Sequence, residues 1–123
     1  MENKIRSFTD LTAWKRGHEL VLMVYRNTDS FPQKERFSLT DQMRRAAVSI
    51  TSNIAEGFSR QSQKEKVRFY SMAKASLTEL QNQLLIARDI GYLAKEDFTS
   101  LANQSVQISK LLSGLIRAIR SRP

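Results

Sequence analysis

The chain has 123 residues, a net charge of +8 and no cysteine. This length suits one domain that buries roughly two-thirds of its unfolded surface, and the lack of cysteine excludes thiol catalysis, zinc ribbons and disulfide frameworks. The longest apolar run, Leu20 to Tyr25, is shorter than a membrane helix, and Met1 to Ser7 leads into no signal-peptide core. We therefore expect a single cytoplasmic domain covering residues 1–123.

Helix-breaking residues divide the chain. It contains four glycines and two prolines, and Pro32, Gly57 and Gly91 fall between stretches with helical periodicity. They separate predicted helices at about residues 10–29, 39–57, 63–90 and 95–121. Four helices of comparable length with short connections predict an all-α fold, an antiparallel up-down-up-down four-helix bundle.

The first two segments each show one apolar face. In segment 10–29 apolar residues recur at three- and four-residue steps, as they do on one side of a helix. The predicted inner face there consists of Leu11, Trp14, His18, Val21, Leu22 and Tyr25. In segment 39–57 it consists of Met43, Ala46, Ala47, Ile50, Ile54 and Gly57, whose small members would let a neighbouring helix approach closely.

A polar stripe follows the opposite side of segment 39–57. Its members are Arg45, Ser49, Asn53 and Glu56. A fully exposed face is rarely so poor in long charged groups, so a hydrogen-bonded network at a helix or subunit interface explains the stripe better. Leu85 lies about 160° from the centre of the apolar stripe of its own helix. Together these features lead us to expect self-association.

The last two segments have clear ends and faces. Ser62 and Glu65 have the spacing of a capping box, and Gly91 is suited to the left-handed conformation that ends a helix. The predicted inner face of segment 63–90 consists of Phe69, Met72, Ala73, Ser76, Leu80, Leu84 and Ala87. That of segment 95–121 consists of Phe98, Leu101, Ser105, Ile108, Leu112, Leu115, Ile116 and Ile119.

No residue pattern predicts catalysis. His18 is the one histidine, and no cysteine or second histidine could share a metal with it, so a core or boundary position is favoured over a ligand. The chain has no glycine-rich phosphate loop, no Gly-x-Ser-x-Gly elbow and no paired Glu-x-x-His motifs. We expect a protein without enzymatic activity, metal, cofactor or small-molecule substrate, although missing motifs leave a metal-free nuclease open.

Basic residues gather in three places, and no acidic residue follows Asp97. The candidates for phosphate contact are Arg44, Arg60, Lys64, Lys66, Arg68, Lys110, Arg117 and Arg120. Such side chains bind the nucleic-acid backbone without reading its sequence. The chain shows no zinc finger, homeodomain or RNP-type strand, and a solvated basic face that maintains solubility is the alternative interpretation.

The chain contains a series of short motifs: Asp10-Leu11, Ala13-Trp14-Lys15, Phe31-Pro32, Leu39 to Ile50, Ser52-Asn53-Ile54-Ala55-Glu56-Gly57, Arg68-Phe69-Tyr70, Met72-Ala73, Ser76-Leu77, Glu79-Leu80 and Gly91-Tyr92-Leu93. Together these motifs resemble one family, the four-helix-bundle proteins encoded in intervening sequences of 23S ribosomal RNA genes, also called S23-type. Thr51 stands where the family usually has Pro, and Ala75 where it often has Gly. Both changes suit a helix.

This resemblance extends to the accessory variability determinant of diversity-generating retroelements. That protein has the same bundle, assembles as a homopentameric barrel and binds nucleic acid and a reverse transcriptase. The resemblance therefore implies a bacterial bundle protein that forms a homopentamer. Together with the charge, it favours a non-catalytic protein that binds nucleic acid, RNA above all. An oligomeric scaffold or adaptor for a protein partner is the alternative.

Overall fold

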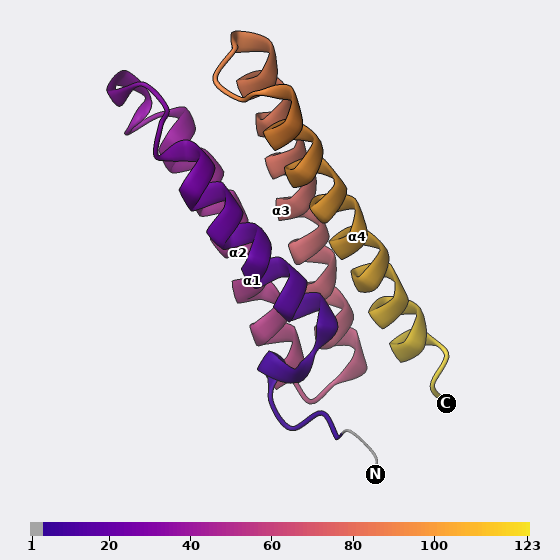
Figure 1. Ribbon diagram of the computed structural model, residues 1–123. Helices are drawn as coiled ribbons and strands as arrows, with labels where there is room; N and C mark the ends of the chain where they lie inside the picture. Colours follow the sequence, from indigo (N-terminus) through magenta and orange to yellow (C-terminus); the bar gives the residue numbers. More distant parts are fainter. Residues whose placement is uncertain (1–3) are drawn as a thin grey trace.

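The computed structural model describes residues 4–123 and shows an all-α, antiparallel four-helix bundle (Figure 1). The long helices are α1 (Thr12–Thr28), α2 (Leu39–Ser59), α3 (Gln63–Ile90) and α4 (Lys95–Arg120), and the short 3-10 turns η1 (Phe8–Asp10) and η2 (Gln33–Glu35) precede α1 and α2. The predicted fold class is confirmed. Residues 1–3, part of the segment inspected for a targeting signal, lie outside the described residues.

Each helix packs against two others: α1 against α2 and α4, and α3 against α2 and α4. One end of the bundle holds the α2–α3 connection and both chain termini, and we call it the termini end (Figure 1). The α1–α2 and α3–α4 connections lie at the opposite end. Segments far apart in sequence, the start of α3 and the last turns of α4, therefore meet at the termini end.

A capping box fixes the chain before α1. The Ser7 hydroxyl accepts from the amide of Thr9, and the Asp10 carboxylate accepts from the amides of Arg6 and Ser7 at 3.0 and 3.1 Å. These backbone hydrogen bonds hold the pKa of Asp10 below its usual value. The first long helix consequently begins at Thr12, after the 3-10 turn, and not at the predicted residue 10.

Of the predicted inner face of α1, Leu11, Trp14 and Val21 are half-buried against the core, and the other three residues are exposed. The buried residues are Ala13, Gly17, Leu20, Val24 and Thr28. Leu22 and Tyr25 are 45% and 42% exposed, and His18 is exposed. The reason lies at Gly17, where a Cβ atom would stand only 3.1 Å from Cγ2 of Thr51. Helices α1 and α2 approach each other along small residues. The aromatic rings of α1 therefore lie at the edge of this contact, where His18 stacks on Trp14.

Gly57 lies inside α2 and does not end it, in contrast to the prediction from its position in the sequence. The helix continues to Ser59, and Gly57 is buried with an ordinary helical backbone. A Cβ atom at this position would lie 2.7 Å from Cε1 of Tyr70. The glycine thus lets α3 cross the last turn of α2 at close range. By contrast, Gly91 ends α3 as predicted, with φ of +98°.

Because Tyr70 packs on Gly57, the buried face of α3 is rotated relative to the predicted one. Tyr70 and Leu77 are buried, whereas Met72, predicted to point inward, is 41% exposed and Phe69 and Ser76 are half-buried. Half of the predicted capping box forms: the Ser62 hydroxyl accepts from the Glu65 amide, but the Glu65 carboxylate pairs with Arg68. The core of α4 is as predicted, with Leu101, Ser105, Ile108, Leu112, Ile116 and Ile119 buried.

The end opposite the termini is closed by an aromatic contact. The Tyr92 hydroxyl donates to the Glu35 carboxylate at 2.9 Å, and its ring packs 5.2 Å from that of Phe31. This hydrogen bond raises the pKa of the Tyr92 hydroxyl. It joins the α3–α4 connection to the α1–α2 connection and so holds the two hairpins together.

The Gly57 contact predicts opposite effects for two glycine substitutions. Gly57→Ala places a methyl group against the Tyr70 ring and should lower the free energy of unfolding by about 1–3 kcal/mol. Gly114→Ala in α4 meets open space, with the nearest atom at 4.0 Å, and should raise it by about 0.5–1 kcal/mol because alanine favours helix. Urea unfolding measures both. A neutral or stabilising Gly57→Ala would contradict the proposed close contact.

Candidate nucleic-acid interface

The structure brings most of the predicted phosphate-contacting residues to the termini end. Arg60 follows α2, Lys64, Lys66 and Arg68 lie in the first turns of α3, and Arg117 and Arg120 lie in the last turn of α4. Lys110 is exposed roughly 15 Å back along α4 from Arg120 at 1.5 Å per residue. Arg44 lies 16 residues before Arg60, close to the opposite end.

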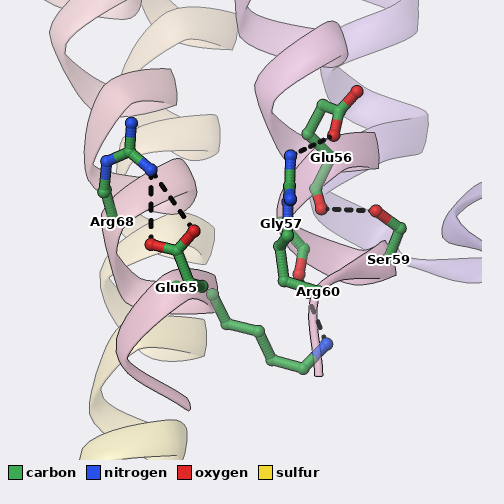
Figure 2. Close-up of polar contacts among 7 residues, drawn as sticks. Glu56, Gly57, Ser59, Arg60, Glu65 and Arg68 are labelled. Atoms are coloured by element: carbon green, nitrogen blue, oxygen red, sulfur yellow. Dashed lines mark hydrogen bonds and ion pairs between the residues drawn. The ribbon is translucent and has the colours of Figure 1, made fainter. Parts of the chain in front are cut away.

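At the α2–α3 corner, arginines pair with carboxylates of their own helices. Arg60 lies 3.1 Å from Glu56, and Arg68 lies 3.2 Å from Glu65. Figure 2 shows the two pairs on the two neighbouring helices. Both guanidinium groups also lie over the Phe69 ring, at 4.6 and 5.1 Å from its centroid. Exposed pairs of this kind add little stability, but a phosphate here would compete with the carboxylates.

The side chain of Lys66 forms hydrogen bonds with the backbone. Its Nζ donates to the carbonyl oxygens of Phe58 at 2.7 Å and Gly57 at 3.3 Å, which are among the last carbonyl groups of α2. A cation at this position satisfies acceptors that the helix leaves free and interacts favourably with the helix dipole. Burial lowers the pKa of Lys66 below its usual value, and the charge of Arg122 lowers it further. The residue stabilises the α2–α3 connection.

Arg44 similarly joins two helices. Its Nε donates to the Thr28 hydroxyl at 3.0 Å, and its guanidinium lies 4.6 Å from the centre of the Tyr25 ring. The side chain is half-buried between the end of α1 and the second turn of α2. This arrangement explains Arg44 as a link between α1 and α2, away from the basic cluster.

The remaining candidate residues have no carboxylate partner within the described part of the chain. Within residues 4–123, Lys64, Lys110, Arg117 and Arg120 form no ion pair. Three of them, Lys64, Arg117 and Arg120, border shallow hollows between α3 and α4. Their charges are available to a polyanion.

The polar stripe of α2 does not form one network. Arg45 pairs with Asp41 at 2.9 Å, and Glu56 pairs with Arg60. The middle of the stripe reaches α3: the hydroxyls of Ser49 and Ser76 are 2.8 Å apart. Asn53 Nδ2 donates to the carbonyl and the hydroxyl of Ser49. The stripe therefore includes a contact between helices of one chain, while Arg45 remains open to solvent. Leu85, the other predicted interface residue, is 42% exposed on α3.

Sequence reasoning missed a polar contact beside these cations. Lys74 Nζ donates to the Ser113 hydroxyl at 2.8 Å, across 39 residues of sequence. Lys74 lies in segment 63–90 of the sequence, and no local pattern places Ser113 next to it. Only the register between α3 and α4 does.

Other kinds of site find no support in the described part of the chain. Residues 4–123 contain no group of three His, Cys, Asp or Glu side chains that could hold a metal ion. In the same range, no helix is both long and apolar enough to cross a membrane.

The family model for 23S rRNA-intervening sequence proteins matches residues 9–114. The chain belongs to this family. A crystal structure of a protein of unknown function from the S23 ribosomal protein family of Bacteroides thetaiotaomicron has the same fold, with a TM-score of 0.78. The two are 24% identical, and the match covers 85% of this chain and 95% of that one. No curated protein matches the chain significantly.

The contact of Lys66 with the end of α2 predicts that two neighbouring lysines differ in their effect on stability. Lys66→Met removes the donor to Phe58 and should lower the free energy of unfolding by roughly 1 kcal/mol. Lys64→Met removes the same charge from an exposed position and should change it by less than about 0.5 kcal/mol. Urea unfolding of both variants provides the test, and equal losses would argue against the capping role.

Proposed function

We propose that this member of the 23S rRNA-intervening sequence protein family is a non-catalytic, cytoplasmic RNA-binding protein that acts as a homo-oligomeric ring. One observation carries the binding role: cations from three parts of the chain meet at the termini end, and Lys64, Arg117 and Arg120 have no carboxylate partner in residues 4–123. Such a surface binds phosphates through charge and counterion release. The family is named for intervening sequences of 23S rRNA, and from this association we propose RNA as the nucleic acid.

The ring is proposed because the chain exposes apolar side chains on more than one face. A closed ring needs two different patches that complement each other. Met72, Leu85 and Ile86 of α3 are each about 41–42% exposed, and Leu22 and Tyr25 of α1 are 45% and 42% exposed. Five copies, the number that the resemblance implies, would multiply a modest charge into a strong binding surface, because linked sites raise effective concentration.

The second candidate function is an adaptor for a protein partner. It is favoured by the aromatic edge of α1, where Trp14 and His18 stack at 4.8 Å beside exposed Leu22. A partner helix could lay its apolar side on such a face. This mode depends on buried apolar area, so its response to salt differs from that of phosphate binding.

Salt dependence distinguishes these functions. If the protein binds RNA, affinity for mixed-sequence RNA should fall by orders of magnitude between low and physiological salt. Arg117→Ala with Arg120→Ala should flatten the salt slope by up to about one unit for each phosphate group that a protomer ceases to bind. Filter binding at several salt concentrations measures the slope.

A charge-matched control strengthens this test. Lys34→Ala with Arg36→Ala removes the same charge at the opposite end of the bundle, in and beside η2, and should leave most of the slope unchanged. Undetectable binding of RNA and DNA at low salt would favour the adaptor, since a cationic oligomer built to hold polyanions has no physical reason to ignore them there.

Assembly is tested separately. Light scattering of the wild type at micromolar concentration should show a closed oligomer, and Leu85→Asp should shift it towards the monomer by placing a charge in an apolar contact. Phe37→Asp, in the α1–α2 connection and 87% exposed, serves as the control and should leave assembly intact. A wild-type monomer would refute the ring.

A further inference from the structure

Two neighbouring hollows follow the boundary between α3 and α4 at the termini end. One part, of about 370 Å³, is lined by Gln63, Lys64, Val67, Ile119 and Arg120. The next, of about 440 Å³, is lined by Ser71, Lys74, Ser113, Ile116, Arg117 and Arg120. Because both contain Arg120, we treat them as one, the α3–α4 groove. From Gln63 to Lys74 it extends roughly 16 Å along α3 at 1.5 Å per residue.

The lining of the α3–α4 groove carries positive charge without compensation. It includes two lysines and two arginines and no acidic residue. None of these cations forms an ion pair within residues 4–123. The α2–α3 corner at the same end of the bundle differs, because Arg60 and Arg68 each have a glutamate. At the termini end, the groove is therefore the place where, among the described residues, the cations have no acidic partner.

Hydrogen-bond donors converge in the groove beside these charges. The Ser113 hydroxyl accepts from Lys74 Nζ at 2.8 Å, so its own proton remains available to donate. Within residues 4–123 neither Ser71 nor Ser113 donates to a backbone carbonyl, whereas Thr78, one turn from Lys74, donates to the Lys74 carbonyl. Lys74 is half-buried and keeps two further ammonium protons. An ammonium, a guanidinium fork and a hydroxyl are the donors that proteins use for phosphate oxygens.

The shape of the groove favours one strand over a duplex or a lone ion. Its length exceeds a single phosphate group, and its cations are spread along it from Lys64 to Lys74. Its width is set by two helices packed side by side, typically 8–10 Å between axes. A double helix is wider than its own major groove, which measures about 12 Å, so both strands cannot enter together. Val67, Ile116 and Ile119 provide an apolar floor.

We propose that the α3–α4 groove binds a single strand of nucleic acid through its phosphates, with Lys74 and Ser113 forming one phosphate subsite together with Arg117 and Arg120. This inference rests on the proposed RNA-binding function and goes further by placing the strand. It also assigns direct phosphate contacts to Lys74 and Ser113. Arg60 and Arg68 then contribute only to the overall positive potential of the surface.

The test compares variants of equal charge at the same end of the bundle. Lys74→Gln with Arg120→Gln removes two cations of the groove, and Arg60→Gln with Arg68→Gln removes two cations of the corner. Fluorescence anisotropy at low salt measures the affinity of each full-length variant for a labelled mixed-sequence oligoribonucleotide. The groove variant should lose about tenfold or more and the corner variant about threefold or less. Ser113→Ala, which changes no charge, should lose about two- to fivefold.

The same strand annealed to its complement is the second ligand, and the wild type should bind it more weakly than the single strand. Circular dichroism checks that each variant keeps its helicity. Equal losses for the groove and corner variants, or equal affinity for the duplex, would overturn the groove assignment while leaving RNA binding in place. Failure of the wild type to bind either ligand at low salt would instead overturn the proposed function itself.

Discussion

The close approach of α2 and α3 at Gly57 is the contact on which the rest of the termini end depends. The Tyr70 ring occupies the space that any side chain at residue 57 would need, so the last turn of α2 lies directly on the first turns of α3. At that distance Lys66 reaches the Phe58 carbonyl, and Arg60 lies over the ring of Phe69. A larger residue would push the helices apart and remove these contacts together. The packing at Gly57 therefore determines that Lys66 and Arg60 make contacts within the fold.

The positive charge of the termini end is of two kinds, paired and unpaired. Acidic residues occur on the α2–α3 side, where Glu56 and Glu65 pair with arginines, whereas no acidic residue follows Asp97 in α4. The termini end combines the starts of α1 and α3 with the ends of α2 and α4, so the dipoles of the antiparallel helices largely cancel there. The positive charge of this end thus comes from side chains, and between α3 and α4 the lining residues include no acidic partner for it.

Sequence periodicity predicted the fold and the core of α4 because that helix alternates clearly between aliphatic and polar residues. It assigned half of the inner face of α1 wrongly, since the periodicity of large apolar residues favours Leu22 and Tyr25 over Ala13 and Gly17. In the bundle the small residues are buried instead, because the free energy gained by close helix packing depends on how near the backbones come. The basic clusters were readable from the sequence, and so was the spacing of Glu56 with Arg60 and of Glu65 with Arg68, four and three residues apart along a helix. The contact of Lys74 with Ser113 was not readable, because only the register between α3 and α4 creates it.

The chemistry of the α3–α4 groove also bears on what a bound strand could do. Its polar groups are donors suited to phosphate oxygens, and its floor is aliphatic, with no aromatic ring among the lining residues on which a base could stack. A strand held there by its backbone would leave its bases facing outward. Such binding is indifferent to sequence, because base edges are not read, and it keeps those edges open to pairing with a second strand. In the proposed ring, the grooves of several protomers would each hold a strand, or a part of one long strand, with its bases facing outward. Under the proposed function, such a protein would hold single-stranded RNA with its base edges open for another molecule to recognise.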